Sequence, residues 1–220
     1  MALRVTGPYP EAVITGTRKN LAARWLRRFA IAAILCTLAC TSAPEFRGHT
    51  LDTAAPAHLE GVNWDGSEFD LASLDHDVVV VFFGYTFCPD VCPMTLGRMK
   101  QVLAELDERQ AERVGVVFVS VDPERDTLDK LADYVPHFDR RFYGVRLDDD
   151  ALEGAKLSFG VSSRNVDPPS GGENGFYFVD HTGSVFLLDA SGRPRVSHPN
   201  EAPLADVVAD VEALLAAGAA

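Results

Sequence analysis

Two cysteines four positions apart are the residues of this chain that could do the most chemistry. Cys88 and Cys92 lie in the segment FGYTFCPDVCPMTL, residues 83–96, and each is followed by a proline. A residue before proline is disfavoured in helical conformation, so both cysteines should be extended or cap-like in a stiff loop. Thiolate sulfur is a soft ligand that selects copper(I), zinc or iron–sulfur iron. The pair therefore indicates a metal site or a redox disulfide, and inert packing is the weaker interpretation.

The elements around the cysteine pair place it at the end of a buried strand. Residues 78–83 form an unbroken run of valine and phenylalanine, which predicts a strand buried on both faces. Residues 95–110 carry apolar side chains at helical spacing. Pro93 suits the first helical position and Cys92 the cap, where the helix dipole would favour a thiolate. The pair should therefore lie at the carboxyl edge of a sheet, where α/β proteins place their sites.

The remaining domain alternates predicted strands and helices. A second buried strand is expected at 114–121, followed by a helix that opens at 126 or 127 and carries apolar residues to 135. Further helices are expected at 151–159 and 204–215, and a hairpin of 176–179 with 184–188. Two buried strands joined through a helix imply a parallel unit with a right-handed crossover, and the late hairpin adds antiparallel strands. We predict an α/β fold, a thioredoxin-like sandwich with a central mixed sheet. Residues 161–175 are expected to form a long polar loop, which in a compact domain is usually functional or mobile.

The first 40 residues are typical of an export leader. Five basic residues within 18–28 precede an apolar stretch at 29–39, and small residues follow it. This stretch is shorter than the roughly 20 residues that cross a bilayer, although an uncleaved helical anchor remains the alternative. Cys40 ends a TLAC motif that resembles a lipoprotein cleavage box, which makes it a lipidation candidate. We expect a leader or membrane anchor at 1–40, a tether at 41–57 and one domain at 58–217, on the periplasmic face of a membrane.

The charge of the chain argues against nucleic acid as a partner. The formal net charge is −12, and the first 39 residues, with six Lys or Arg and one Glu, leave −17 for the rest. Such an acidic domain repels phosphate backbones. We expect no nucleic-acid partner.

Three sequence blocks together resemble the Sco (SenC) family. They are the cysteine segment at 83–96, SVDPERDT at 120–127 and VDHT at 179–182, in family order, and the similarity covers roughly residues 57–216. Phe87 departs from members that have histidine there, a position without a ligand role. The resemblance implies one copper ion per chain, Cu⁺ or Cu²⁺, held by Cys88, Cys92 and His181.

The case for His181 can also be made from its surroundings. An isolated histidine is usually at the surface or satisfied in the core, but the turn at His181 precedes a strand expected beside the cysteines. Asp180 or a main-chain carbonyl could hold its second ring nitrogen, as metal-bound imidazoles require. His198, in a turn near the last helix, is the runner-up. Two thiolates and one imidazole suit three-coordinate copper(I), whereas copper(II) and zinc would take a fourth donor.

Charged residues near the cysteines should support the site without binding the metal. We expect Asp126 to cap the helix that follows it, and Arg125 to pair with Asp122 or Asp90. That arrangement would position the loop after the second buried strand. Asp90, Asp122, Arg125 and Asp180 are thus candidates for contacts around the ligands.

Three functions remain open at this point. The resemblance implies a copper metallochaperone that helps assemble the dinuclear copper centre of cytochrome c oxidase, with the copper-accepting oxidase subunit as partner. A thiol–disulfide reductase acting on that subunit's cysteines is the second. A peroxiredoxin-like peroxidase is the third, since Thr86 stands before Cys88, although the spacing is too short and the matching arginine context is not evident. We expect a metallochaperone rather than an enzyme.

Overall fold

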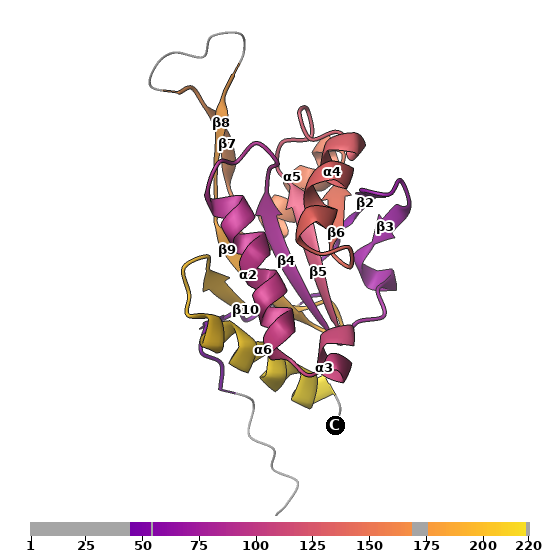
Figure 1. Ribbon diagram of the computed structural model, residues 1–220, viewed down its shortest axis with the longest axis vertical. Coiled ribbons are helices and arrows are strands. Elements are labelled where there is room, and N and C mark those ends of the chain that lie inside the picture. The colour runs from indigo at the N-terminus through magenta and orange to yellow at the C-terminus, as the bar shows by residue number, and fades with distance from the viewer. Residues whose placement is uncertain (1–44, 54, 169–175, 219–220) are drawn as a thin grey trace, which may run out of the picture. The chain divides into compact units, whose positions relative to one another are not determined.

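A mixed eight-stranded sheet forms the centre of the molecule (Figure 1). The computed structural model describes residues 45–53, 55–168 and 176–218, which belong to one compact unit. The strand order is β1-β10-β9-β4-β5-β6-β2-β3, with β4, β5 and β6 parallel and the other pairings antiparallel. The bounds are β1 His49–Thr50, β2 Glu60–Asn63, β3 Glu68–Asp70, β4 Val78–Gly84, β5 Val114–Ser120, β6 Tyr143–Arg146, β9 Ser184–Asp189 and β10 Pro194–Pro199. The predicted thioredoxin-like α/β fold with a central mixed sheet is confirmed.

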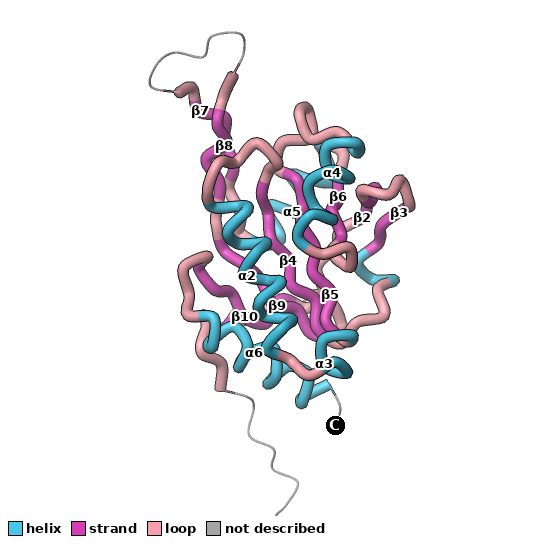
Figure 2. Tube along the Cα trace, viewed as in Figure 1, coloured by secondary structure: helices cyan, strands magenta, loops and turns pink. Residues whose placement is uncertain are grey.

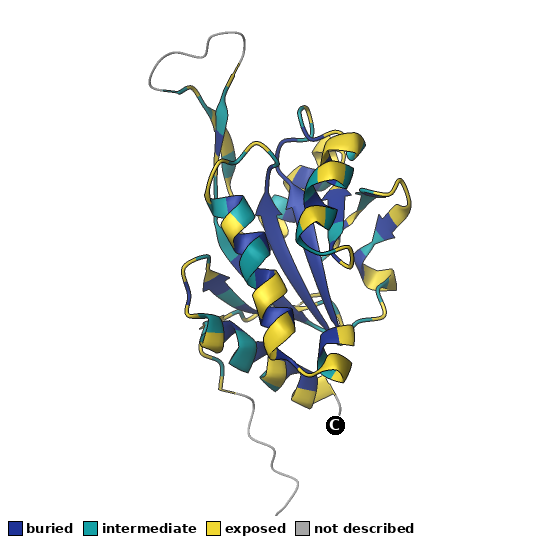
Figure 3. Ribbon diagram, viewed as in Figure 1, coloured by how far each residue is buried: buried dark blue, intermediate teal, exposed yellow. Residues whose placement is uncertain are grey.

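Helices cover the sheet and bury its central strands (Figure 2). They are the 3-10 turn η1 Leu71–Ser73, and α2 Val91–Glu105, α3 Glu108–Glu112, α4 Leu128–Phe138, α5 Asp149–Phe159 and α6 Leu204–Gly218. Phe82 packs against Phe118, which in turn meets Tyr134 of α4. Phe83, the next residue of β4, points to the opposite face and packs against Phe159 of α5. Because both faces are covered, every residue of β4 and β5 is buried (Figure 3).

The helix of the cysteine segment begins two residues before Pro93, the predicted first helical position. α2 starts at Val91 with Asp90 as its N-cap, so Cys92 lies inside the first turn. Pro93 is tolerated there because amides of the first turn have no partner within the helix. The predicted single helix to residue 110 is two helices, because Asp107 and Gln110 form a capping box that starts α3.

The predicted pairing of residues 176–179 with 184–188 in a hairpin is wrong. β8 (Phe178–His181) pairs with β7 (Ser163–Val166) in a separate two-stranded ribbon, and β9 instead lies between β4 and β10. The buried run of β9 needs neighbours on both edges, whereas β8 has a single fully buried residue, Val179. β7 falls within the segment predicted as a loop. His181 is therefore the last residue of a strand and not part of a turn.

The amino-terminal predictions fall mostly outside the described residues. The leader at 1–40 and Cys40 lie there, as does the start of the tether. In the described part of the tether, β1 pairs with β10. None of the helices in the described part of the chain has the length and apolar character needed to cross a membrane.

Candidate metal centre

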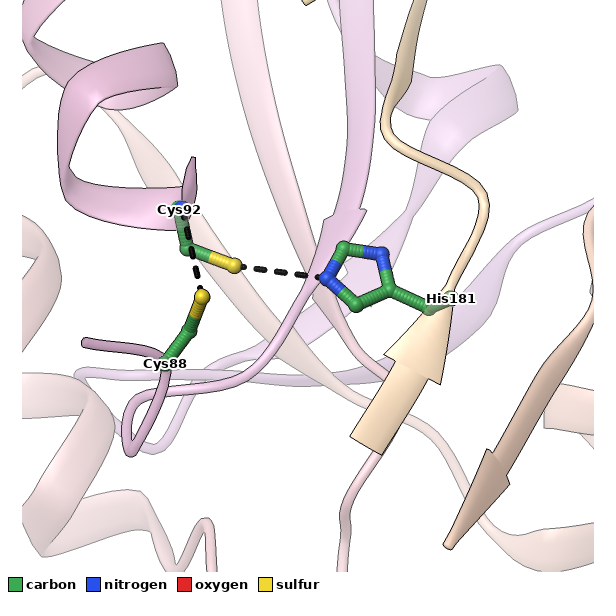
Figure 4. Close-up of side chains that lie close together, drawn as sticks. All are labelled: Cys88, Cys92 and His181. Carbon is green, nitrogen blue, oxygen red and sulfur yellow. Dashed lines mark hydrogen bonds between the residues drawn. The ribbon is translucent and has the colours of Figure 1, made fainter. Parts of the chain in front are cut away.

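Cys88, Cys92 and His181 converge at one point (Figure 4). Their donor atoms all lie within 4.8 Å of one another, and Cys92 Sγ is 3.5 Å from His181 Nε2. Two sulfurs around a common zinc-sized ion, with bonds of about 2.3 Å, can be at most about 4.6 Å apart. The three donors are thus spaced to surround a single ion with little rearrangement.

A glycine at the end of β4 makes room for one of the sulfurs. A Cβ built on Gly84 would lie 2.9 Å from Cys92 Sγ and 2.7 Å from the Phe118 ring, closer than real Cβ contacts. The loop after Gly84 carries Cys88, and α2 then brings Cys92 back over the strand end. The junction of β4 with α2 therefore positions both cysteines through backbone packing.

The two thiols have opposite electrostatic surroundings. Cys92 is fully buried, whereas Cys88 is half-buried. A hydrogen bond from the Cys92 thiol, aided by His181 and by the amides of Asp90 and Cys92, lowers the pKa of Cys88 to about 3. The same hydrogen bond, together with burial and the Cys88 charge, raises the pKa of Cys92. In the metal-free protein the thiolate is therefore favoured at Cys88 and not, as predicted, at Cys92, because proximity to Cys88 and burial outweigh the helix dipole.

The imidazole of His181 is oriented by the main chain. His181 Nδ1 lies 3.1 Å from the carbonyl oxygen of Thr182, and its Nε2 faces Cys92. A proton on Nδ1 donated to this carbonyl leaves the Nε2 lone pair free for a metal. Of the two partners predicted for the second nitrogen, the carbonyl is the one observed. Asp180 instead pairs with Arg164 at 2.8 Å on the exposed side of the ribbon.

His198 is engaged elsewhere. It is 2% exposed on β10, and its Nε2 lies 2.8 Å from a carboxylate oxygen of Asp210 in α6. Its ring is thus hydrogen-bonded to Asp210 in the core between β10 and α6. His198 is therefore not available as the alternative metal ligand.

The acidic residues near the site play different parts from those predicted. Thr127, not Asp126, caps α4. Asp126 is buried and accepts hydrogen bonds from Ser120 Oγ and from the amide and hydroxyl of Thr86. Burial raises the pKa of Asp126 despite these bonds. The carboxylate therefore fastens the loop that leads to Cys88.

Of the two partners predicted for Arg125, Asp122 is the one observed. The distance from Arg125 Nε to Asp122 Oδ2 is 2.6 Å, and the Asp90 side chain makes no capping bond to α2. The hydroxyl of Tyr177 donates to Asp122 at 2.7 Å. Tyr177 was not predicted, and no sequence signal marks it. Thr86 and Gly84 were missed as supporting residues, although both lie within the cysteine block.

Comparison with known proteins agrees with this geometry. The sequence pattern of the SCO1/SenC family matches residues 49–216. The chain belongs to the SCO1/SenC family. An SCO2-like protein of Rickettsia felis is 30% identical over 135 residues, which cover 61% of this chain and 64% of the relative. The chain thus matches just under two thirds of that relative's length.

Two solved structures of SCO1/SenC proteins resemble the fold. Apo Sco1 from Thermus thermophilus is 34% identical, with a TM-score of 0.67 over 77% of this chain and 97% of its own. Copper-bound ScoI from Bradyrhizobium japonicum is 30% identical, with a TM-score of 0.64 over 72% of this chain and 98% of its own. A relative at this level of identity has therefore been seen with copper.

Proposed function

We propose that this protein carries one copper ion between Cys88, Cys92 and His181 and delivers it to the copper-accepting subunit of cytochrome c oxidase, helping to assemble the dinuclear copper centre. The observation that carries the proposal is the convergence of two sulfurs and one imidazole nitrogen from segments 89 residues apart. Membership of the SCO1/SenC family and the copper-bound relative support it.

The donor set favours copper as the cargo. Two thiolates and an imidazole are soft or borderline ligands, and copper(I) accepts three-coordination. A structural zinc site would take four protein ligands. Within the described residues, the group holds three His, Cys, Asp or Glu side chains and no fourth.

The burial of the donors suits delivery by ligand exchange. Cys92 is fully buried, while Cys88 and His181 are partly exposed. An incoming thiolate or imidazole can therefore replace the exposed donors one at a time while Cys92 still holds the ion. We propose this order of release for the transfer.

The second candidate, a thiol–disulfide reductase, is favoured by the low pKa of Cys88. In that reaction the Cys88 thiolate attacks a client disulfide, forms a mixed disulfide and releases one client thiolate. Cys92 then loses its proton and attacks Cys88 sulfur, which leaves a Cys88–Cys92 disulfide and frees the second client thiolate. Copper binding is the better-supported function, because a dithiol reductase needs only the two cysteines and leaves the convergence of His181 with them unexplained.

Copper titration of the reduced, purified protein tests the proposal. We expect one copper per chain by metal analysis, and sulfur-to-copper charge-transfer absorption with copper(II). Cys88→Ser and Cys92→Ser should each abolish that absorption while far-UV circular dichroism stays that of the folded protein. Unchanged spectra in both variants would remove the cysteines from the site. Reduction of a client disulfide by copper-free protein, with no copper binding, would favour the reductase instead.

A further inference from the structure

The strand that carries His181 is not hydrogen-bonded to the sheet that positions the cysteines. Within the described residues β8 pairs only with β7, in a ribbon that extends away from the main sheet (Figure 1). On its carboxyl side, His181 is separated from β9 by two residues, and the pairing of β9 with β4 constrains that side relative to the cysteine edge. Among the described residues, the amino-terminal end of β8 has no pairing with the main sheet, so contacts outside the sheet must hold that end.

A closed ring of polar contacts lies where the chain enters β8. Arg125 Nε donates to one Asp122 oxygen at 2.6 Å, and the hydroxyl of Tyr177 donates to the other at 2.7 Å. Arg125 Nη1 donates to the Tyr177 carbonyl oxygen at 2.7 Å, and the guanidinium carbon lies 3.5 Å from the Tyr177 ring centroid. Tyr177 immediately precedes β8. The ring therefore ties the start of that strand to the loop after β5.

The same guanidinium also contacts the cysteine loop. Its central carbon is 5.1 Å from the Phe87 ring, which precedes Cys88, and 5.8 Å from the Tyr85 ring. Tyr85 in turn packs edge-on against the His181 ring at 5.8 Å. These distances are within the range of cation–π and aromatic contacts. Arg125 thus touches both segments that supply metal donors.

Burial makes these contacts strong. The side chains of Asp122 and Arg125 are 3% and 18% exposed. A hydrogen-bonded ion pair in such surroundings is screened little by water, and removing one partner leaves the other charge uncompensated. Lysine cannot replace arginine here, because its single ammonium has no planar fork to bond Asp122 and the Tyr177 carbonyl while stacking on the ring.

We infer that Asp122, Arg125 and Tyr177 form a latch that positions His181 against Cys88 and Cys92. The three are positioning residues, and the inference rests on the proposed copper site. A closed latch favours copper(II), which needs the imidazole as a donor. Copper(I) can be held by two thiolates in a linear arrangement and depends less on the latch.

The test compares Arg125→Met with a matched control in the purified, reduced protein. Arg125→Met should weaken copper(II) binding at least about tenfold, equivalent to about 1.4 kcal/mol, and alter the charge-transfer spectrum. Copper(I) affinity should change by less than about threefold on the same scale. Arg164→Met removes an arginine that pairs with Asp180 on the same ribbon without reaching the cysteine loop, and should bind both ions like wild type.

A double-mutant cycle separates positioning from a general structural effect. If the latch acts through His181, Arg125→Met should have little further effect on copper(II) binding in the His181→Ala background. An equal loss in both backgrounds would overturn the inference, and so would wild-type copper(II) affinity in Arg125→Met.

Hydrogen exchange of the metal-free protein gives a readout that does not depend on copper. Arg125→Met should accelerate amide exchange in β8 selectively, with β4 and β5 unchanged. Unchanged exchange in β8 would contradict the latch. If wild type binds no copper, the proposed function fails while this measurement still decides the latch. Should Arg125→Met not fold, Tyr177→Phe removes one hydrogen bond, keeps the ring, and should show the same changes more weakly.

Discussion

The two cysteines of the site differ in charge because of their immediate neighbours. Cys92 is buried, which raises the pKa of its thiol, whereas the sulfur of Cys88 accepts a main-chain amide of α2 and has a lowered pKa. The negative charge therefore resides on Cys88, at the half-exposed side of the site. Cys88 should react first with reagents and partners, and Cys92 should be the last donor to release an ion.

Alkylation of the reduced, metal-free protein tests this assignment. A thiol with a pKa of about 3 is almost fully ionised across pH 5–8, so iodoacetamide should modify Cys88 at a nearly constant rate over that range. An ordinary thiol, with a pKa near 8.5, would slow about tenfold per pH unit. Peptide mapping by mass spectrometry identifies the modified residue. Cys92→Ala should restore the steep pH dependence, and modification of Cys92 before Cys88 would show the assignment to be reversed.

Replacement of His181 tests the third donor. His181→Ala should keep the fold and both thiols, lose the native copper(II) spectrum, and weaken copper(II) binding more than copper(I) binding. The physical reason is that two thiolates alone can hold copper(I) but leave copper(II) short of donors. His58→Ala, at a side chain that is 76% exposed, is the control and should retain the wild-type spectrum. Retention of that spectrum by His181→Ala would mean that another group completes the site.

At the scale of elements, the site depends on how closely α2 approaches the end of β4. Gly84 has no Cβ, and the space a Cβ would fill is occupied by Cys92 Sγ and the Phe118 ring. The buried strand and the first turn of α2 can therefore bring the sulfur over the sheet edge. The register of the ribbon then supplies His181 at the end of β8.

Gly84→Ala should disturb the site through this contact. We expect a loss of about 1–3 kcal/mol in the free energy of unfolding from overpacking, together with weaker copper binding as Cys92 Sγ is displaced. Denaturant unfolding and copper titration measure the two effects. Gly97→Ala in α2 is the matched control, because a Cβ there meets nothing within 4 Å and should stabilise the helix by about 0.5–1 kcal/mol. Wild-type copper binding by Gly84→Ala would show that the close approach is not needed.

At the scale of the whole molecule, a second polar cluster joins the amino-terminal segment to the far end of the chain. Asp210 of α6 is 1% exposed and accepts the amides of Arg47 and Gly48 at 2.7 and 2.8 Å. It also pairs with His198 of β10 at 2.8 Å. This cluster holds β1 beside β10, and it shares no residue with the metal centre.

His198→Ala should therefore affect stability without affecting copper. Leaving a buried acceptor without one of its hydrogen-bond donors costs about 1–3 kcal/mol, and the two amides that still bond Asp210 should keep the loss within that range. Urea unfolding followed by circular dichroism gives the stability, and the copper(II) spectrum gives the site. A changed spectrum in this variant would place His198 in contact with the metal centre after all.

Local sequence patterns determined the central part of this fold and the candidate sulfur donors. An unbroken run of valine and phenylalanine specifies β4, and a valine-rich run specifies β5, because strands buried on both faces are predominantly apolar. The prolines after both cysteines and the strand before them likewise indicated the site. Each of these signals lies within one short segment, so it can be recognised without knowing which distant segments pack against it.

Tertiary structure decided the features that depend on distant partners. Asp126 stands where a helix cap is expected, yet its carboxylate accepts a hydrogen bond from Thr86, 40 residues away. β8 pairs with β7 and not with β9, and Tyr177 joins Asp122 across 55 residues. Which sulfur carries the charge depends on the burial of Cys92 and on the distance between the two thiols. Local periodicity cannot contain such information, because burial and long-range pairing are settled only when the segments pack together.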